Sequence, residues 1–163
     1  MQLILIRHGV AVERDEWHLD DFLRPLTPKG EEKTRAALRG IARVCDAPDL
    51  LASSPKTRAL QTANILHEFW KQVPLEVWPE LGGDDFDPWL AKIGSCSAAS
   101  LCLVGHEPHL SRFTSLLLSG NADRSDILWK KAGALALEVD GTQKRGQLLW
   151  MLPPRILRVV GEK

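Results

Sequence analysis

The sequence predicts an α/β protein, a three-layer αβα sandwich built on a mainly parallel sheet. Short apolar segments alternate along the chain with longer amphipathic ones, as strands and helices do in such proteins. Two of the apolar segments, LILI at 3–6 and LCLV at 101–104, are continuous, as in strands buried on both faces. No repeat, low-complexity segment or linker interrupts the 163 residues, so we expect residues 1–163 to form a single domain.

The first half of the chain is predicted to hold two strands, each followed by a helix. Gln2 to Ile6 is a strand that ends at the glycine of RHG, and a polar loop rich in Asp and Glu follows. Thr27 is a good N-cap, so a helix is predicted from Pro28 to about Val44. A second strand is predicted around 49–52, and Ser54-Pro55 is predicted to open a helix that reaches about Trp70.

The second half continues with apolar runs separated by polar, Gly-rich turns. Its predicted elements are a strand within 74–81, a short helix at about 88–93, a strand within 100–106, a helix from about His109 to Leu118, and two adjoining strands within 133–140 and 146–154. The last two strands are expected to be joined by a turn that contains Gly141.

Composition argues against several classes of function. The 21 Lys and Arg residues balance the 21 Asp and Glu residues, whereas a general nucleic-acid binder should carry a basic stripe. Cys45, Cys96 and Cys102 lack CxxC spacing, so neither a disulfide framework nor a zinc site is expected. No membrane span or signal peptide is visible. We therefore expect a cytoplasmic protein with reduced thiols, no metal, no cofactor, and neither nucleic acid nor membrane as a partner.

Charged residues follow the predicted strands at the points where these strands end. Arg7 and His8 follow the first strand, His106 follows the fourth, and Arg58 lies one turn inside the helix after the second. The carboxyl ends of parallel strands meet at one edge of a sheet, together with the N-termini of the following helices, so the four side chains should converge. Two arginines and a helix N-terminus favour a dianion, and phosphate is the obvious candidate.

These residue types suit phosphoryl transfer. A neutral imidazole can attack phosphorus in line and carry the phosphoryl group covalently, which makes His8 the candidate nucleophile. The neighbouring Arg7 and Arg58 should lower the pKa of His8 and keep it neutral at pH 7. Arg7, Arg58 and His106 should bind phosphoryl oxygens and stabilise the transition state. Each residue alone would be an ordinary surface arginine or structural histidine, and the combination indicates an active site.

Three motifs, LIRHG, SSPKTRALQT and LVGHEP, resemble in order those of the histidine phosphatase superfamily, which includes the phosphoglycerate mutases. The short chain, RPLTPKG after the first loop and LPPRILR near the end are similar to its phosphohistidine phosphatase branch, the SixA kind. The resemblance runs from Met1 to about Arg158 and implies a phosphoglycerate mutase-like fold. It assigns the same roles to Arg7, His8, Arg58 and His106.

Two positions near the predicted site are open to more than one interpretation. Arg24 in RPLT is either a further phosphate contact from the first loop or a salt-bridged loop residue, and the sequence favours neither. Ser54 could donate to phosphate from the helix start, but an N-cap role is the stronger prediction.

The resemblance leaves the acidic proton donor in doubt. Family members that cleave phosphomonoesters carry such a donor in a pattern resembling PEL-x-E, but Gly83 stands where the second acid is expected. Glu80, Asp84 and Asp85 remain candidates, although each is more simply a turn or rim residue. An alkoxide leaves poorly unless it is protonated, whereas the imidazole of phosphohistidine leaves well. The missing acid therefore favours phosphohistidine as the substrate.

The sequence thus predicts a hydrolase that removes phosphate from phosphohistidine on a protein, such as a phosphorelay domain, through a covalent intermediate on His8. A chain of 163 residues leaves little for a lid, which suits a phosphorylated side chain on a protein. Two alternatives stay open, a low-specificity phosphatase acting on small phosphate esters and a non-catalytic phosphate-binding module. The Arg7-His8 pair argues against the module, because binding alone needs no nucleophilic imidazole.

Overall fold

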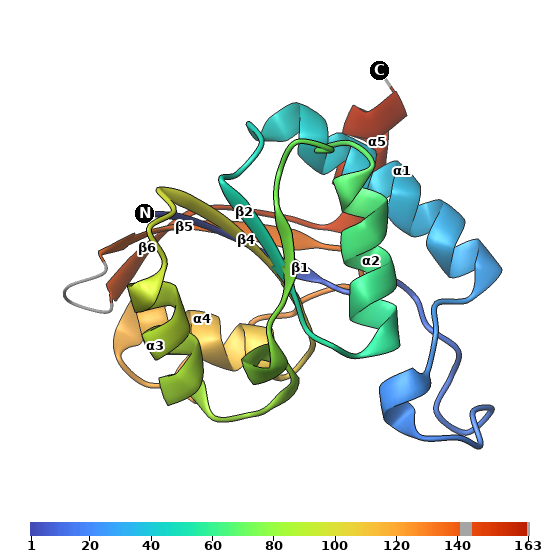
Figure 1. The fold of residues 1–163 in the computed structure, drawn as a ribbon, viewed down its shortest axis with the longest axis horizontal. Coiled ribbons are helices and arrows are strands. Elements are labelled where there is room, and N and C mark those ends of the chain that lie inside the picture. The colour runs from blue at the N-terminus through green and yellow to red at the C-terminus, as the bar shows by residue number, and fades with distance from the viewer. Residues whose placement is uncertain (141–144, 163) are drawn as a thin grey trace.

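A six-stranded sheet forms the centre of the computed structural model, which describes residues 1–140 and 145–162 (Figure 1). The strands are β1 (Gln2–Arg7), β2 (Leu50–Ser53), β3 (Leu75–Val77), β4 (Ser100–Gly105), β5 (Ala134–Asp140) and β6 (Arg145–Leu152). Their order across the sheet is β3-β2-β4-β1-β5-β6. The pairs β1–β4, β2–β4 and β2–β3 are parallel, and β5 is antiparallel to both neighbours. The mainly parallel sheet is confirmed, while the turn expected at Gly141 lies outside the described residues.

Helices cover both faces of this sheet (Figure 1). The helices are α1 (Pro28–Val44), α2 (Thr57–His67), α3 (Phe86–Ser95), α4 (His109–Ser119) and α5 (Pro154–Glu162), with short 3-10 helices η1 (Asp21–Leu23) and η2 (Pro79–Gly82). One apolar cluster joins α1, α2 and α5 to Ile4 and Ile6 of β1. The other joins α3 and α4 to Leu3 and Leu5. Alternate side chains of one strand thus serve both helical layers, which confirms the three-layer αβα architecture.

Helix α1 forms where its end signals predict it. The Thr27 hydroxyl accepts a hydrogen bond from the Gly30 N–H at 2.9 Å, and Pro28 occupies the first turn. Gly40 lets α1 approach α5 closely, since a Cβ at this position would lie 2.0 Å from the Leu157 carbonyl oxygen. Helix α5 was not predicted from the sequence, although Pro154 at its start is a common first residue of a helix.

The elements next to the site differ from prediction in their bounds. Helix α2 begins at Thr57 rather than at Ser54-Pro55, because the chain is still extended at Ser54, whose N–H donates to the Val104 carbonyl at 3.0 Å. It ends at His67 rather than at Trp70. Strand β3 covers only three residues, since the chain turns into η2 at Pro79. Helix α3 begins at Phe86, where the Asp85 carboxylate caps its first turn.

The sequence also led to predictions about the cysteines, membrane-spanning helices and metal sites. Cys45, Cys96 and Cys102 are free thiols. None of the helices between residues 1 and 140 or between 145 and 162 is long and apolar enough to cross a membrane. Within the same ranges, no group of three or more His, Cys, Asp or Glu residues is arranged to hold a metal ion. The cytoplasmic location stays a prediction.

Candidate active site

The four predicted site residues come from neighbouring elements at one edge of the sheet. Arg7 ends β1 and pairs in register with Gly105, which ends β4. The His8 N–H donates to the Gly105 carbonyl at 3.0 Å, and His106 follows directly. Strand β2 lies on the other side of β4 and leads into α2, where Arg58 is the second residue. Parallel pairing therefore brings all four to the carboxyl edge.

The glycine of RHG is needed because the chain passes very close to two helices. A Cβ at Gly9 would lie 1.9 Å from Thr34 Oγ1 of α1. The Gly9 N–H donates to Thr62 Oγ1 of α2 at 3.1 Å, and that hydroxyl in turn donates to the Arg58 carbonyl at 2.7 Å. The backbone after His8 is thus fixed against the helix that carries Arg58.

His8 is held as a neutral imidazole with one free nitrogen. Its side chain is buried, with the residue only 6% exposed, and Nδ1 lies 2.7 Å from the Gly9 carbonyl oxygen. A carbonyl only accepts, so Nδ1 carries the proton and Nε2 keeps its lone pair. Burial, aided by the charges of Arg58 and Arg7, lowers the pKa of His8 to about 3, although the bond to Gly9 acts to raise it. At neutral pH the ring is therefore uncharged and has a lone pair on Nε2.

His106 lies beside His8, with ring centroids 5.0 Å apart. Its Nε2 is 2.8 Å from Ser54 Oγ, a hydroxyl that also accepts the Lys56 N–H at 3.4 Å. The Ser54 hydroxyl can therefore give its own proton to Nε2, which leaves Nδ1 of His106 as the N–H donor. Burial, with the neighbouring His8 and Arg58, lowers the pKa of His106 to about 2.

The predicted N-cap role of Ser54 is wrong. Helix α2 has Lys56 as its N-cap residue, and no side chain caps it. Ser54 instead lies fully buried beside the second histidine, three residues before the helix begins. The hydroxyl is used to orient an imidazole, and the sheet hydrogen bond of the Ser54 N–H to Val104 keeps it there.

The two arginines are held by the far ends of their guanidinium groups. Arg7 Nη1 donates to the Trp129 carbonyl. Arg58, only 4% exposed, donates from Nη1 to the Asp21 carbonyl at 2.8 Å and from Nη2 to Asp21 Oδ2 at 3.0 Å. Burial lowers the pKa of both, yet arginine starts so high that both stay charged at neutral pH.

Three buried nitrogen atoms of this cluster have no partner among the described residues. They are Arg7 Nε, Arg58 Nε and His106 Nδ1. Leaving a buried donor unpaired costs about 1–3 kcal/mol, so folded proteins rarely do it without a reason. An oxyanion with several acceptor oxygens would satisfy all three donors while facing the free Nε2 of His8. The cluster can therefore bind a phosphoryl group and present it to a nucleophile.

Arg24, Asp84, Asp85 and Glu80 are the remaining candidate site residues, and their surroundings differ. Arg24 donates to Asp21 Oδ1 at 2.8 Å and to the Val12 carbonyl at 2.6 Å, which is the salt-bridged loop alternative; a phosphate contact from it stays a prediction. Asp84 and Asp85 are exposed, and Asp85 caps α3. Glu80 is different, because its Oε2 is buried and has no partner within the described chain.

The segment that carries Glu80 adjoins the site. Glu80 is part of η2, and a Cβ built on Gly82 of the same turn would lie 3.9 Å from Ser54 Oγ. Because Ser54 binds His106, η2 lies next to the second histidine. The structure therefore keeps Glu80 as a candidate proton donor without assigning it that role.

Sequence reasoning missed two contributors to the site. Asp21 stands among many acids in VERDEWHLDD, and nothing in that stretch distinguishes it from its neighbours. Trp129 contributes only a main-chain carbonyl, which no side-chain pattern can reveal. The one usable sign for Asp21 is its place three residues before Arg24, a spacing at which two side chains can meet on one turn.

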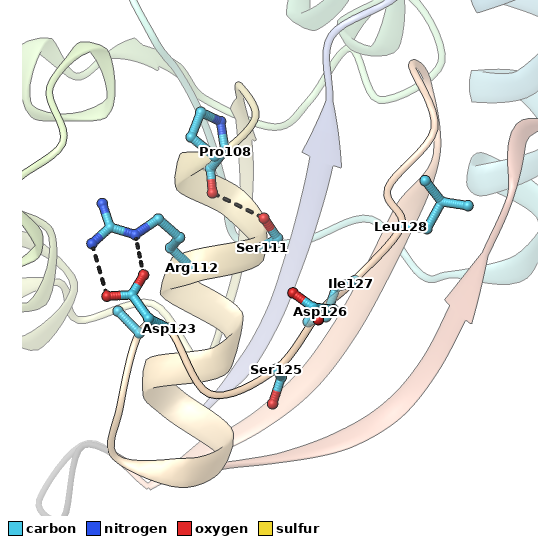
Figure 2. Close-up of a pocket in the computed structure, with 9 residues that line it drawn as sticks. Pro108, Ser111, Arg112, Asp123, Ser125, Asp126, Ile127 and Leu128 are labelled. Atoms are coloured by element: carbon cyan, nitrogen blue, oxygen red, sulfur yellow. Dashed lines mark hydrogen bonds and ion pairs between the residues drawn. The ribbon is translucent and has the colours of Figure 1, made fainter.

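A hollow lies beside α4, between this helix and residues 121–128 (Figure 2). Arg112 and Asp123 form an ion pair in it, with Arg112 Nε 2.8 Å from Asp123 Oδ1. The Ser111 hydroxyl donates to the Pro108 carbonyl at 2.9 Å. None of the predicted site residues is among its lining side chains.

Comparison with known proteins places the chain among related sequences and folds. Residues 3–93 match the histidine phosphatase superfamily (branch 1). An uncharacterized protein of Picosynechococcus sp. strain PCC 7002 is 29% identical over 166 residues, which cover 94% of this chain and 100% of that protein.

Two solved structures share the fold. The protein histidine phosphatase SixA, complexed with tungstate, has a TM-score of 0.82 at 22% identity, covering 96% of this chain and 99% of that chain. The alpha-ribazole phosphatase from Shigella flexneri has a TM-score of 0.72 at 17% identity, covering 94% of this chain and 97% of that chain.

Proposed function

The chain belongs to the histidine phosphatase superfamily, and from that premise we propose that it hydrolyses phosphohistidine on a protein through a phosphorylated His8. One observation carries the proposal. A buried, neutral His8 has a free Nε2, and three unpaired N–H donors lie around it, from Arg7, Arg58 and His106. A phosphate-binding module would need the donors but not the nucleophile.

In the first step, Nε2 of His8 attacks the phosphorus atom of the substrate. The bond between phosphorus and the substrate imidazole breaks, and its electron pair stays on the imidazole nitrogen, which takes up a proton from solvent. A new P–N bond joins the phosphoryl group to His8. Arg7 Nε, Arg58 Nε and His106 Nδ1 donate to the three equatorial oxygens, where negative charge is concentrated in the transition state.

In the second step, water attacks the phosphoryl group on His8. The P–N bond to Nε2 breaks, inorganic phosphate leaves, and Nε2 recovers its lone pair, while the proton lost by the water goes to solvent or to phosphate. The Nδ1–H of His8 stays bonded to the Gly9 carbonyl throughout, so the ring keeps its orientation in both steps.

The leaving group supports a phosphorylated protein as the substrate. Gly83 stands where a second acid is expected, and phosphohistidine needs less help from an acid than an alkyl ester does. SixA, which shares the fold over nearly the whole length of both chains, is named as a protein histidine phosphatase. All six strands form one sheet, which supports our proposal that residues 1–163 act as a single domain. We further propose that it works in the cytoplasm and without a cofactor.

A second candidate, hydrolysis of small phosphate esters, is favoured by one observation. The Glu80 Oε2 is buried without a partner in a turn that adjoins Ser54 and His106, where a protonated carboxyl could serve an alkoxide leaving group. The Shigella flexneri relative in fold is a phosphatase named for a small molecule, alpha-ribazole. The two candidates differ in the leaving group and share the nucleophile.

The test is to trap the intermediate and to compare three substrates. Radiolabelled phosphohistidine peptide is mixed with the protein, quenched in alkali, and examined for label that is alkali-stable, acid-labile and absent from His8→Ala. Hydrolysis of the same peptide, an aryl phosphate and an alkyl phosphate is then measured side by side. We expect a labelled protein, with the peptide and the aryl phosphate well ahead of the alkyl phosphate. Absence of label under single-turnover conditions would overturn the covalent mechanism.

A further inference from the structure

Asp21 is hydrogen-bonded to Arg58 but has no role in the proposed mechanism. Its carboxylate bonds to Arg58 at 3.0 Å and to Arg24 at 2.8 Å, and it lies 3.5 Å from Arg14. Its main-chain carbonyl also accepts from Arg58 Nη1 at 2.8 Å. One residue therefore holds the buried arginine at two points and connects it to the loop that follows β1.

The two points of attachment determine which part of Arg58 is free. A planar guanidinium offers paired N–H donors along two sides, the Nη1/Nη2 end and the side formed by Nε and the adjacent Nη. Asp21 takes the Nη1/Nη2 end through its carbonyl and its carboxylate. Nε is left buried and without a partner in the described structure. The free side of the fork is therefore the one that an oxyanion can bind with two parallel hydrogen bonds.

The loop holds Asp21 firmly enough for this role. The Asp20 carboxylate caps η1 by accepting the Phe22 N–H at 2.9 Å. The base of the loop is closed by a bridge between Ala11 and Leu26, and the Leu26 N–H donates to Gln61 Oε1 of α2 at 2.7 Å. Asp21 is thus anchored to the same helix that carries Arg58.

Asp21 is charged at neutral pH. Burial acts to raise the pKa of its carboxyl, but the hydrogen bond from Arg24 and the charge of Arg58 outweigh it and hold that pKa well below the usual range. Arg24 also offsets the negative charge that Asp21 would otherwise place near a phosphate dianion. This gives Arg24 a function in its salt-bridged position.

We propose that Asp21 is a positioning residue, which holds the Nη end of Arg58 so that the Nε side faces the phosphoryl group. The inference rests on the proposed function only in that Arg58 binds the phosphoryl group. In the opposite role, the Asp21 carboxylate would compete with phosphate for the N–H donors of Arg58. Positioning is favoured because Nε stays free and because one of the two contacts comes from a main-chain carbonyl.

The test is a double-mutant cycle with tungstate as the probe. Tungstate affinity is measured by calorimetry for the wild type, Asp21→Ala, Arg58→Ala and the double variant. Loss of the carboxylate should weaken tungstate binding on the order of tenfold, as expected for a hydrogen bond to a charged group. In the Arg58→Ala background the same change should have almost no further effect, because Asp21 acts through Arg58.

Controls separate positioning from folding. Asp21→Asn keeps the main-chain carbonyl and one side-chain oxygen as acceptors and should recover part of the affinity. Asp20→Asn keeps a capping side chain and should bind tungstate like the wild type. Circular dichroism and thermal unfolding check that each variant is folded, and Asp21→Asn replaces Asp21→Ala in the cycle if the latter is not. Tighter binding by Asp21→Ala, or additive losses in the double variant, would overturn the proposal. Because tungstate binding requires no turnover, the result stands apart from whether phosphorylated His8 is found.

Discussion

Two regions of this molecule, the buried cluster around His8 and the hollow beside α4, differ in how their polar groups are satisfied. At the carboxyl edge of the sheet, His8 and His106 are 6% and 3% exposed, and buried nitrogen donors around them lack partners in the described structure. Beside α4, Arg112 and Asp123 pair with each other (Figure 2). The Asp123 side chain is 71% exposed. Unpaired donors in a buried setting, rather than the presence of a hollow, mark the place where a ligand is expected.

The physical reason is the cost of desolvation. When an exposed ion pair such as Arg112–Asp123 forms, each side chain exchanges hydrogen bonds with water for hydrogen bonds with its partner. Such a pair therefore contributes little to the stability of the fold. A buried guanidinium has already lost its water, so a ligand that completes its hydrogen bonds gains strongly. We therefore expect substitutions in the buried cluster to have larger effects than substitutions beside α4.

Removing the nucleophile should abolish turnover. We expect His8→Ala to lower kcat with p-nitrophenyl phosphate by roughly a thousandfold or more, since neighbouring groups cannot replace a covalent nucleophile. Steady-state kinetics measure the loss, and circular dichroism checks the fold. His67→Gln is the matched control, because His67 lies at the far end of α2 and contacts the Val73 carbonyl. Activity of His8→Ala within tenfold of the wild type would remove the distinction between the buried cluster and the hollow beside α4.

Leaving-group dependence should be steep. Without a strong acid in the site, we expect alkyl phosphates to react roughly a hundredfold more slowly than aryl phosphates. Glu80→Gln should then change the aryl rate less than about threefold. Hydrolysis rates of phosphate esters of phenols and alcohols are measured, and the slope of the logarithm of the rate against the pKa of the leaving group is determined. If Glu80→Gln instead costs about a hundredfold with every substrate, Glu80 is a general acid and the small-ester function replaces the phosphohistidine one.

Acid should destabilise the fold through the site. The pKa values of His8 and His106 are lowered to about 3 and about 2 in the folded chain, so between about pH 6.5 and 3 the unfolded chain binds more protons. The free energy of unfolding therefore falls as pH falls, by up to about 1.4 kcal/mol per pH unit for each histidine. Urea unfolding at pH 7, 6 and 5 measures the slope. His106→Gln should flatten it, and an unchanged slope would contradict the burial of a neutral His106.

Breaking the ion pair beside α4 should have the smallest effect. We expect Arg112→Ala to change the rate with p-nitrophenyl phosphate less than about twofold, because the pair is exposed and separate from the reacting groups. Asp123→Ala, measured in the same assay, is the partner control. A loss of tenfold or more in both variants would make the α4 hollow part of the active site.

Much of the candidate site could be predicted, because helix-capping preferences and the parallel arrangement of the strands both follow from the sequence. The bounds of α1 follow from Thr27 and Pro28, and Arg7, His8 and His106 converge because parallel strands share an edge. The failures concern groups whose role depends on packing between distant segments. Ser54 was predicted to cap a helix because its residue type favours caps, but a sheet hydrogen bond keeps it beside His106.

Other contributions could not be predicted for the same reason. Asp21 differs from its acidic neighbours only in what lies opposite it in space, and the Trp129 carbonyl belongs to no motif. Helix α5 was missed because its docking depends on the close approach to Gly40 of α1, which no local pattern describes.

The central place of β1 also has a consequence for how the protein is made. Its neighbours in the sheet are β4, which begins at Ser100, and β5, which begins at Ala134, so both are synthesised long after β1. At roughly 5–20 residues per second of synthesis, its apolar run waits on the order of 5–20 s for a partner. During that time LILI is an unpaired apolar segment, a kind of segment that favours aggregation. Arg7 and His8 are therefore translated long before the segments that surround them in the fold, so conditions that slow translation should reduce the yield of active protein before they affect the finished fold.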